Sequence, residues 1–320
     1  MKKLLSLFVV AIFIACKSQP QVHKHNKIDD LNSAGEVNEF IHSLLGNYFK
    51  NHVVIDTLAF KDNDFKKLAA AIKPKPWEKT DFDNNGFIDL LIIAKDTNES
   101  FTDDHYDIEC IMDSGENRFF VKSLTAFFLN NSIATVRMVD SLPSIIYYDL
   151  DNPNTYYIDY KGDTLPRPFK KDTLIFKFGG FIEYNKKSDI YDIQNIKFET
   201  SGCFGSCPIF KLDIDKNKNG SYTATRHNTS DKGEKIEGTF KTRINLDDYK
   251  AVEELLSYIN FPKLKDRYTV NWTDDQTATL TITYNNGKTK TISDYGQQGS
   301  FGLRQLYELL YALRLNQNWH

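Results

Sequence analysis

The sequence has little of several features that would assign it to a common class. Only 4 of its 320 residues are cysteine, so it is not a small disulfide-rich scaffold. Its 16 glycines and 9 prolines, set against 41% hydrophobic residues, exclude a disordered or fibrous chain. Acidic and basic residues nearly balance at 43 and 40, whereas a nucleic-acid-binding protein needs an excess of Lys and Arg on one face. What is left is a folded chain long enough for two domains.

The apolar run at the N-terminus, Leu4–Ile14, is too short to span a membrane. It has eleven residues, and a helix needs roughly 20 to cross a hydrocarbon layer about 30 Å thick. Lys2 and Lys3 precede the run, which completes the pattern of a secretory signal. We therefore expect residues 1–15 to be a signal peptide that is absent from the mature protein.

The end of this signal has a feature of its own, the run Phe13-Ile14-Ala15-Cys16. It resembles the lipobox of bacterial lipoproteins, although Phe13 is bulkier than usual. The resemblance implies cleavage before Cys16, a lipid on the Cys16 sulfur and an acylated N-terminus, and two or more acyl chains anchor a protein stably. In Gram-negative lipoproteins an Asp at the next position retains the protein in the inner membrane, and here that residue is Lys17. We expect lipid anchoring in the outer membrane, facing the periplasm or the surface; secretion with an unmodified Cys16 is the alternative.

The remaining chain predicts an α+β fold of two domains, each of mostly antiparallel sheet with a few packed helices. Residues 16–34 are polar and aperiodic, which is typical of a flexible tether. The N-terminal domain spans residues 35–187, and Ser33-x-x-Glu36 is a capping box for its first helix. After a strand at Val53–Leu58 and a second helix, short runs rich in Ile, Val, Tyr and Phe alternate with turn residues up to about Tyr184, as in an antiparallel sheet.

The C-terminal domain, residues 188–320, predicts four strands, a helix, two strands and a final helix. Asn285-Asn286-Gly287 separates the last two strands and is a hairpin signal. The final helix has an apolar face from Leu303 to Leu313, with Ser300 as its N-cap.

One acidic segment has the spacing of a calcium loop. From Asp81 onward it has side-chain oxygens at its first, third, fifth and ninth positions and Gly86 at its sixth, a pattern that suits Ca²⁺. An EF-hand needs Glu at the twelfth position, which here is Ile92 in a predicted strand. The segment instead resembles the loops of FG-GAP repeats, which feed a strand, although only one copy is present. The candidate Ca²⁺ ligands are Asp81, Asp83, Asn85 and Asp89; an acidic turn without an ion is the alternative.

Cys203 and Cys207 lie four positions apart in a predicted turn. In an oxidising envelope such a pair can reach disulfide geometry, and the small ring constrains the unfolded chain by about 2 kcal/mol. We favour a disulfide that staples the turn. An envelope thiol-redox or copper-binding pair, with His227 as third ligand, is the alternative, because Sco-type copper chaperones have a similar C-x-x-x-C-P element. Theirs opens a helix, whereas Pro208 leads into a strand-like run. Cys110 reads as a buried free thiol.

Several motifs of the C-terminal part follow one another in a fixed order. They are a C-F-G-x-C-P turn, an F-x-x-L-x-D-x-Y segment, an Asp before a Thr-rich hairpin, and a final helix. Here they correspond to Cys203–Pro208, Phe261–Tyr268, Asp275 and Leu303–Leu313. Together they resemble an uncharacterised domain family of bacterial lipoproteins, a domain of unknown function. The resemblance supports the domain boundary and a cell-envelope location, and it implies no activity.

The sequence contains no complete catalytic motif. The loop Gly296-x-x-Gly299-Ser300 lies between a strand and a helix, as phosphate-binding loops do, but it lacks the Walker lysine. We therefore expect a non-enzymatic binding or structural lipoprotein that contacts the membrane through its lipid and has an envelope protein or a glycan as partner. Ca²⁺ is the one cofactor suggested. A hydrolase with a site assembled from distant residues is a weaker alternative.

Overall fold

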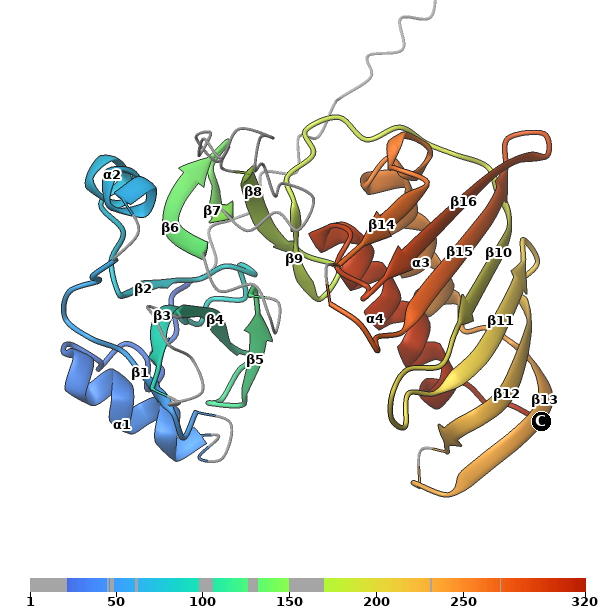
Figure 1. Cartoon of the computed structure of the whole chain (residues 1–320), viewed down its shortest axis with the longest axis horizontal. Coiled ribbons are helices and arrows are strands. Elements are labelled where there is room, and N and C mark those ends of the chain that lie inside the picture. Colours follow the sequence, from blue (N-terminus) through green and yellow to red (C-terminus); the bar gives the residue numbers. More distant parts are fainter. Residues whose placement is uncertain are drawn as a thin grey trace, which may run out of the picture.

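The computed structural model confirms the predicted α+β class: its helices and strands form three mostly antiparallel sheets (Figure 1). The structure describes residues 22–44, 46, 49–60, 63–97, 106–125, 132–149, 170–230, 232–270 and 272–320. The signal peptide and Cys16 lie outside these residues, as do residues 150–169, which fall within the run of short strands expected before Tyr184.

The first sheet is formed by the N-terminal strands. Its elements are α1 (Ala34–Leu44), β1 (His52–Val53), α2 (Asn63–Ile72), β2 (Trp77–Thr80), β3 (Asp89–Asp96), β4 (Tyr106–Asp113) and β5 (Phe119–Ser123). The strand order is β1-β3-β4-β5, and β2 also pairs with β3. α1 begins at the predicted capping box, where the Ser33 N–H donates to the Glu36 carboxylate at 2.9 Å. Its buried Val37 and Ile41 pack with Leu90 and Ile92 of β3.

Two expectations for this region need correction. The strand predicted at Val53–Leu58 is only two residues long, because the backbone of Val54 bonds to the side chain of Asn38 rather than to a strand. The flexible tether was expected to reach residue 34, but Ile28 is fully buried, and Asn26 donates to the Ile88 carbonyl oxygen and to Asp113. Chain packing therefore begins about ten residues earlier than the polar composition suggested.

The second sheet is the middle layer of the molecule. It consists of β6 (Ser132–Val139), β7 (Leu142–Asp149), β8 (Lys170–Lys177) and β9 (Gly180–Glu183), in the order β6-β7-β8-β9. Leu174 and Phe181 join the core that includes Leu91 of β3. Ile175 and Ile182, their neighbours in sequence, join the core of the C-terminal part. Because successive strand residues point to opposite faces, this sheet packs on both sides.

The third sheet has seven strands in the order β13-β12-β11-β10-β15-β16-β14. Its elements are β10 (Ile193–Thr200), β11 (Ile209–Asp215), β12 (Asn219–Thr229), β13 (Lys235–Arg243), α3 (Leu246–Tyr258), the 3₁₀ turn η1 (Phe261–Lys263), β14 (Arg267–Thr269), β15 (Thr277–Tyr284), β16 (Lys288–Tyr295) and α4 (Phe301–Asn316). The predicted order of strands and helices is confirmed, and the turn at Asn285–Gly287 joins β15 to β16. The short strand β14 was not predicted; it pairs in parallel with β16.

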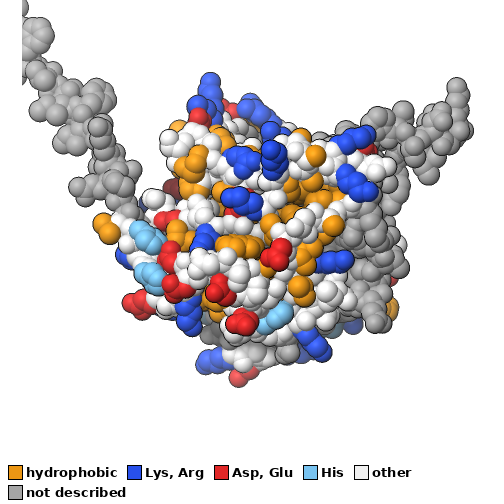
Figure 2. All heavy atoms as spheres, turned by 90° about the vertical axis from the view of Figure 1, so that its left-hand side faces the viewer, with side chains coloured by type: hydrophobic (Ala, Val, Ile, Leu, Met, Phe, Trp, Pro, Cys, Tyr) orange, Lys and Arg blue, Asp and Glu red, His pale blue; other side chains and the backbone are white. Residues whose placement is uncertain are grey.

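The surface on the N-terminal side carries charges of both signs. Figure 2 shows Lys and Arg mainly toward the top of this face and Asp and Glu mainly lower, with hydrophobic side chains between them. Within the described part of the chain, none of the helices is both long and apolar enough to cross a membrane.

Candidate ligand-binding site

A cavity of about 440 Å³ lies between the middle sheet and the C-terminal part. One wall comes from the middle sheet and the segment after it: Asp149, Lys170, Asp172, Glu183 and Asn185. The opposite wall comes from the end of α3 and the segment through β14: Tyr258, Ile259, Leu264, Lys265, Tyr268, Thr269 and Val270. Gln298, Gly299 and Ser300, just before α4, complete the lining. A polar and charged wall therefore faces an aromatic and aliphatic one.

The loop before α4 is fixed by hydrogen bonds that use the free N–H groups of the helix. Ser300 caps the helix by accepting from the Leu303 N–H at 3.2 Å. The two carboxylate oxygens of Glu183 accept from the N–H groups of Phe301 and Gly302, both at 2.8 Å. Glu183 thus occupies the positive end of the helix, where a phosphate would otherwise bind. The Gly296–Gly302 loop serves as a cap here, as its missing lysine suggested.

Behind this loop lies the buried carboxylate of Asp294. It accepts from the Gly299 N–H at 2.9 Å, and burial raises its pKa to about 6. A Cβ atom on residue 299 would lie 2.7 Å from both an Asp294 oxygen and the ring of Tyr268. Glycine is therefore required at this position, because only it allows the loop to contact Tyr268 and Asp294 together.

The charges on the polar wall are largely paired with one another. The Lys170 ammonium lies 2.9 Å from an Asp172 oxygen. Burial lowers the pKa of Lys170, but the attraction of Asp172 outweighs this, and the net shift is upward. Since Glu183 is held by α4, both Asp172 and Glu183 are engaged within the protein.

The tyrosines of the opposite wall have their hydroxyl groups engaged within the protein. The Tyr258 hydroxyl accepts from the Asn185 N–H at 2.8 Å, and the Tyr268 hydroxyl accepts from the Lys265 N–H at 3.1 Å. Lys177 lies on the Tyr258 ring, 4.4 Å from its centroid. Both tyrosines are thereby held in place and contribute aromatic carbon surface to the lining.

The two cysteines of the C-terminal part lie away from this cavity and form the predicted disulfide, with a Cα–Cα distance of 5.8 Å. The turn that they close joins β10 to β11, and its Phe204 N–H donates to the Asp274 carbonyl oxygen at 2.9 Å. Among the described residues, no group of three potential metal ligands includes these cysteines or His227. Cys110 is a buried free thiol, as predicted. The redox or copper alternative stays a hypothesis.

The candidate calcium ligands are brought together only in part. Asp81, Asp83 and Asp89 each place one carboxylate oxygen within 4.8 Å of the oxygens of the other two. Asn85 instead donates from its amide nitrogen to Asp83 at 3.0 Å, while its oxygen accepts from the Phe87 N–H. Burial raises the pKa of Asp83 to about 6 and that of Asp89 to about 8. Calcium binding by this loop stays a prediction from the sequence.

The comparison with known protein families gives a match within the C-terminal part of the chain. Residues 194–314 match a domain of unknown function, DUF6438. The match covers nearly all of the third sheet with α3 and α4, and it includes the lining from Tyr258 to Ser300. This agrees with the resemblance to an uncharacterised domain family. A search of the curated proteins gives no match, and neither does a search of the solved structures.

The sequence alone did not reveal this cavity. Leu264 and Tyr268 belong to the F-x-x-L-x-D-x-Y segment, so that motif pointed to one wall without indicating its role. The charged wall gave no recognisable pattern, because Asp149, Lys170 and Glu183 come from three different strands of the middle sheet.

Proposed function

We propose that this protein is a lipid-anchored lipoprotein of the outer membrane that binds a short glycan, without catalysis, in the cavity between the middle sheet and the DUF6438 domain. The observation that carries the proposal is the cavity itself, whose two unlike walls enclose about 440 Å³. Small-molecule sites typically range from about 300 to 1,000 Å³, so the space suits a ligand of one or two sugar units.

The chemistry of the two walls favours a sugar over an ion. A sugar ring has an apolar face that packs on aromatic rings such as Tyr268, and its hydroxyl groups both donate and accept hydrogen bonds. The Asp149 carboxylate and the Gln298 amide are groups of the kind that bond such hydroxyls. A free cation or anion is less favoured, because Asp172 is already paired with Lys170 and Glu183 with the start of α4.

Calorimetric titration with maltose, cellobiose and N,N′-diacetylchitobiose tests the binding proposal. At least one of these sugars should bind, and Tyr268→Ala should weaken it by about tenfold or more, since it removes the aromatic face. Tyr268→Phe keeps the ring and should retain most of the affinity. Phe204→Ala is the matched aromatic control, because Phe204 is exposed and lies outside the cavity. The proposal fails if none of the sugars binds, or if Tyr268→Ala binds as the unaltered protein does.

The anchor is supported by the lipobox-like run that ends at Cys16 and by Lys17 after it. Cells fed radioactive palmitate should label the protein, and the label should be lost in Cys16→Ser. The same variant should leave the membrane fraction, while Cys110→Ser should remain labelled and membrane-bound. Normal processing in the presence of globomycin, which inhibits the lipoprotein signal peptidase, would contradict lipidation.

A further inference from the structure

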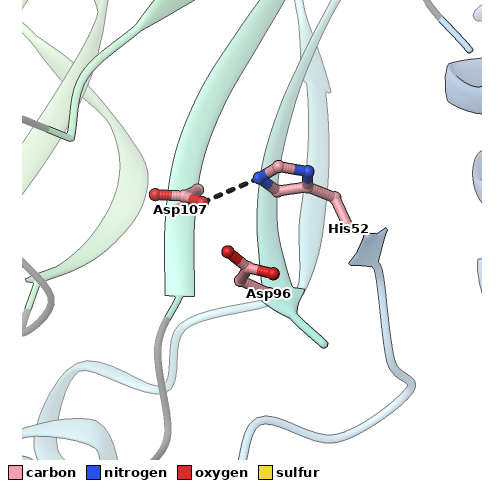
Figure 3. Close-up of side chains that lie close together, drawn as sticks. All are labelled: His52, Asp96 and Asp107. Atoms are coloured by element: carbon pink, nitrogen blue, oxygen red, sulfur yellow. Dashed lines mark hydrogen bonds and ion pairs between the residues drawn. The ribbon is translucent and has the colours of Figure 1, made fainter. Parts of the chain in front are cut away.

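A group of metal-ligand side chains that the sequence did not reveal lies at one end of the first sheet. It consists of His52 on β1, Asp96 at the end of β3 and Asp107 on β4 (Figure 3). The His52 Nε2 atom lies 2.8 Å from an Asp107 carboxylate oxygen. One ligand atom from each of the three residues lies within 4.8 Å of the others, and none of the three lines the glycan cavity.

The strand register places these three side chains on the same face of the sheet. His52 is paired with Asp96, and Asp107 is paired with Ala94. Paired residues of neighbouring strands point the same way, as do residues two apart in one strand such as 94 and 96. Three adjacent strands thus present one imidazole and two carboxylates to the same point, on a backbone fixed by its hydrogen bonds.

The surroundings hold the imidazole in place and shield it from water. The His52 and Asp107 side chains are only 15% and 17% exposed. Phe49 packs edge-on against the imidazole with ring centroids 5.6 Å apart, and the His52 carbonyl oxygen lies 2.9 Å from His42 Nε2. A site on strands with such support needs little rearrangement to bind a ligand.

The acidic groups around His52 favour a cation. Asp96, Asp107 and the buried Glu109 all place negative charge near the imidazole. A divalent ion is attracted by these carboxylates, and an ion of the right type also binds the imidazole nitrogen.

We propose that His52, Asp96 and Asp107 form a binding site for a divalent transition-metal ion of the Zn²⁺ type. An imidazole nitrogen with two carboxylate oxygens suits Zn²⁺, since Ca²⁺ and Mg²⁺ prefer oxygen alone and Cu(I) prefers sulfur. Ligands on one tetrahedral Zn²⁺ lie about 3.4 Å apart, so small side-chain rotations suffice from the present spacing. Three protein ligands leave the fourth position to water or to a ligand atom of a partner.

Zn²⁺ titration of the full chain, purified in detergent and freed of metal with EDTA, tests the site. A competing chromophoric chelator should report one tightly bound equivalent, and His52→Ala and Asp107→Asn should each weaken it by more than about tenfold, since even outer-shell changes reach that range. Ca²⁺ in excess should not displace the metal. Co²⁺ bound to the unaltered chain should show the visible absorption of nitrogen and oxygen ligation without sulfur. This spectrum tests the proposed ligand set even if His52→Ala does not fold.

The controls address the other histidines and acids. His23 and His25 lie beside Asp29 and Asp30, so the double variant His23→Ala/His25→Ala tests a competing site near the N-terminus. Asp83→Asn does the same for the acidic loop. Both controls should keep the bound equivalent. The proposal is overturned if the unaltered chain binds no Zn²⁺, if the equivalent is lost in either control, or if folded His52→Ala binds as tightly as the unaltered chain.

Discussion

The first and third sheets are both mostly antiparallel, but they differ in which residues they bury. The first sheet holds Asp89, Glu109 and Asp113 in or beside its core, each at most 2% exposed. The core of the third sheet is made of hydrophobic residues. Among the described residues of this sheet, Asp294, which lies behind the cavity, is the one buried acidic residue. Buried carboxylates lower stability unless they are bonded or paired, so their placement marks where the fold accommodates chemistry rather than packing.

This difference suggests a division of roles around the middle sheet. The first sheet bonds its acids to backbone N–H groups, as Asp89 does with Phe82 and Asp113, and it carries the proposed metal site. The strands β10 and β15 of the third sheet alternate buried residues with mostly half-buried ones, so the sheet supports the aromatic wall of the cavity. The predictions below test this comparison, beginning with the largest effect.

A core substitution in the third sheet should have the largest effect on stability. Phe198 is fully buried, stacks on Tyr307 and meets Phe210 edge-on. Phe198→Ala should lower the free energy of unfolding by about 3–5 kcal/mol, measured by chemical denaturation. Phe204→Ala, at an exposed phenylalanine of the same domain, should change it by less than about 0.5 kcal/mol. Similar losses in the two variants would contradict a tightly packed third sheet.

The buried acid beside the cavity should make stability depend on pH. Because the pKa of Asp294 is about 6 in the folded chain and 3.8 is its ordinary value, the folded state binds the proton more tightly. Stability should therefore fall as the pH rises from 4 to 7, by up to about 3 kcal/mol. Asp83 and Asp89 also have raised pKa values and add to this fall, so Asp294→Asn should reduce the fall rather than remove it and should be more stable at pH 7, in denaturation curves measured across that range. An Asp294→Asn profile as steep as that of the unaltered chain would refute the assignment.

The disulfide should contribute less than either of these. The double variant Cys203→Ser/Cys207→Ser should lose about 2 kcal/mol of stability, since the closed ring is small. The Cys110→Ser variant removes a cysteine but leaves the disulfide intact, so it is the control for replacing a cysteine by serine. Sugar binding should persist in the double variant, because the turn does not line the cavity. Loss of sugar binding on reduction would instead favour a functional role for the cysteine pair.

The smallest effect should come from calcium at the acidic loop. Extracellular sites bind Ca²⁺ with dissociation constants of about 10⁻⁴–10⁻³ M, so millimolar Ca²⁺ should stabilise the chain by roughly 1 kcal/mol. Asp83→Asn should abolish this rise in the melting temperature, measured by calorimetry with and without Ca²⁺. Equal stabilisation of both proteins would show that Ca²⁺ acts elsewhere.

The parts of the fold that depend on local rules could be predicted from the sequence. Ser300 caps α4, Asn285–Gly287 turns between two strands, and Cys203 pairs with Cys207. Each of these depends on residues only a few positions apart. The short strand β14 carries too few residues for a pattern of its own.

The candidate sites depend on distant residues, which is why the sequence did not reveal them. His52 and Asp107 come together only through the register of β1, β3 and β4. The cavity requires the middle sheet to pack on the third sheet, where Ile175 and Ile182 join the core. The polar residues from 24 to 33 resemble a tether by composition, yet Ile28 and Leu31 among them are buried.

Hydrogen exchange with and without a bound sugar tests the central claim most directly. The claim is that the middle sheet and the DUF6438 domain form a single ligand site. With the best-binding of the three sugars, exchange should slow both in residues 170–185 and in residues 258–270 and 298–300, and it should stay unchanged around Cys203–Cys207. Slowing on one wall only, slowing elsewhere in the chain, or no slowing at saturating sugar would contradict the claim.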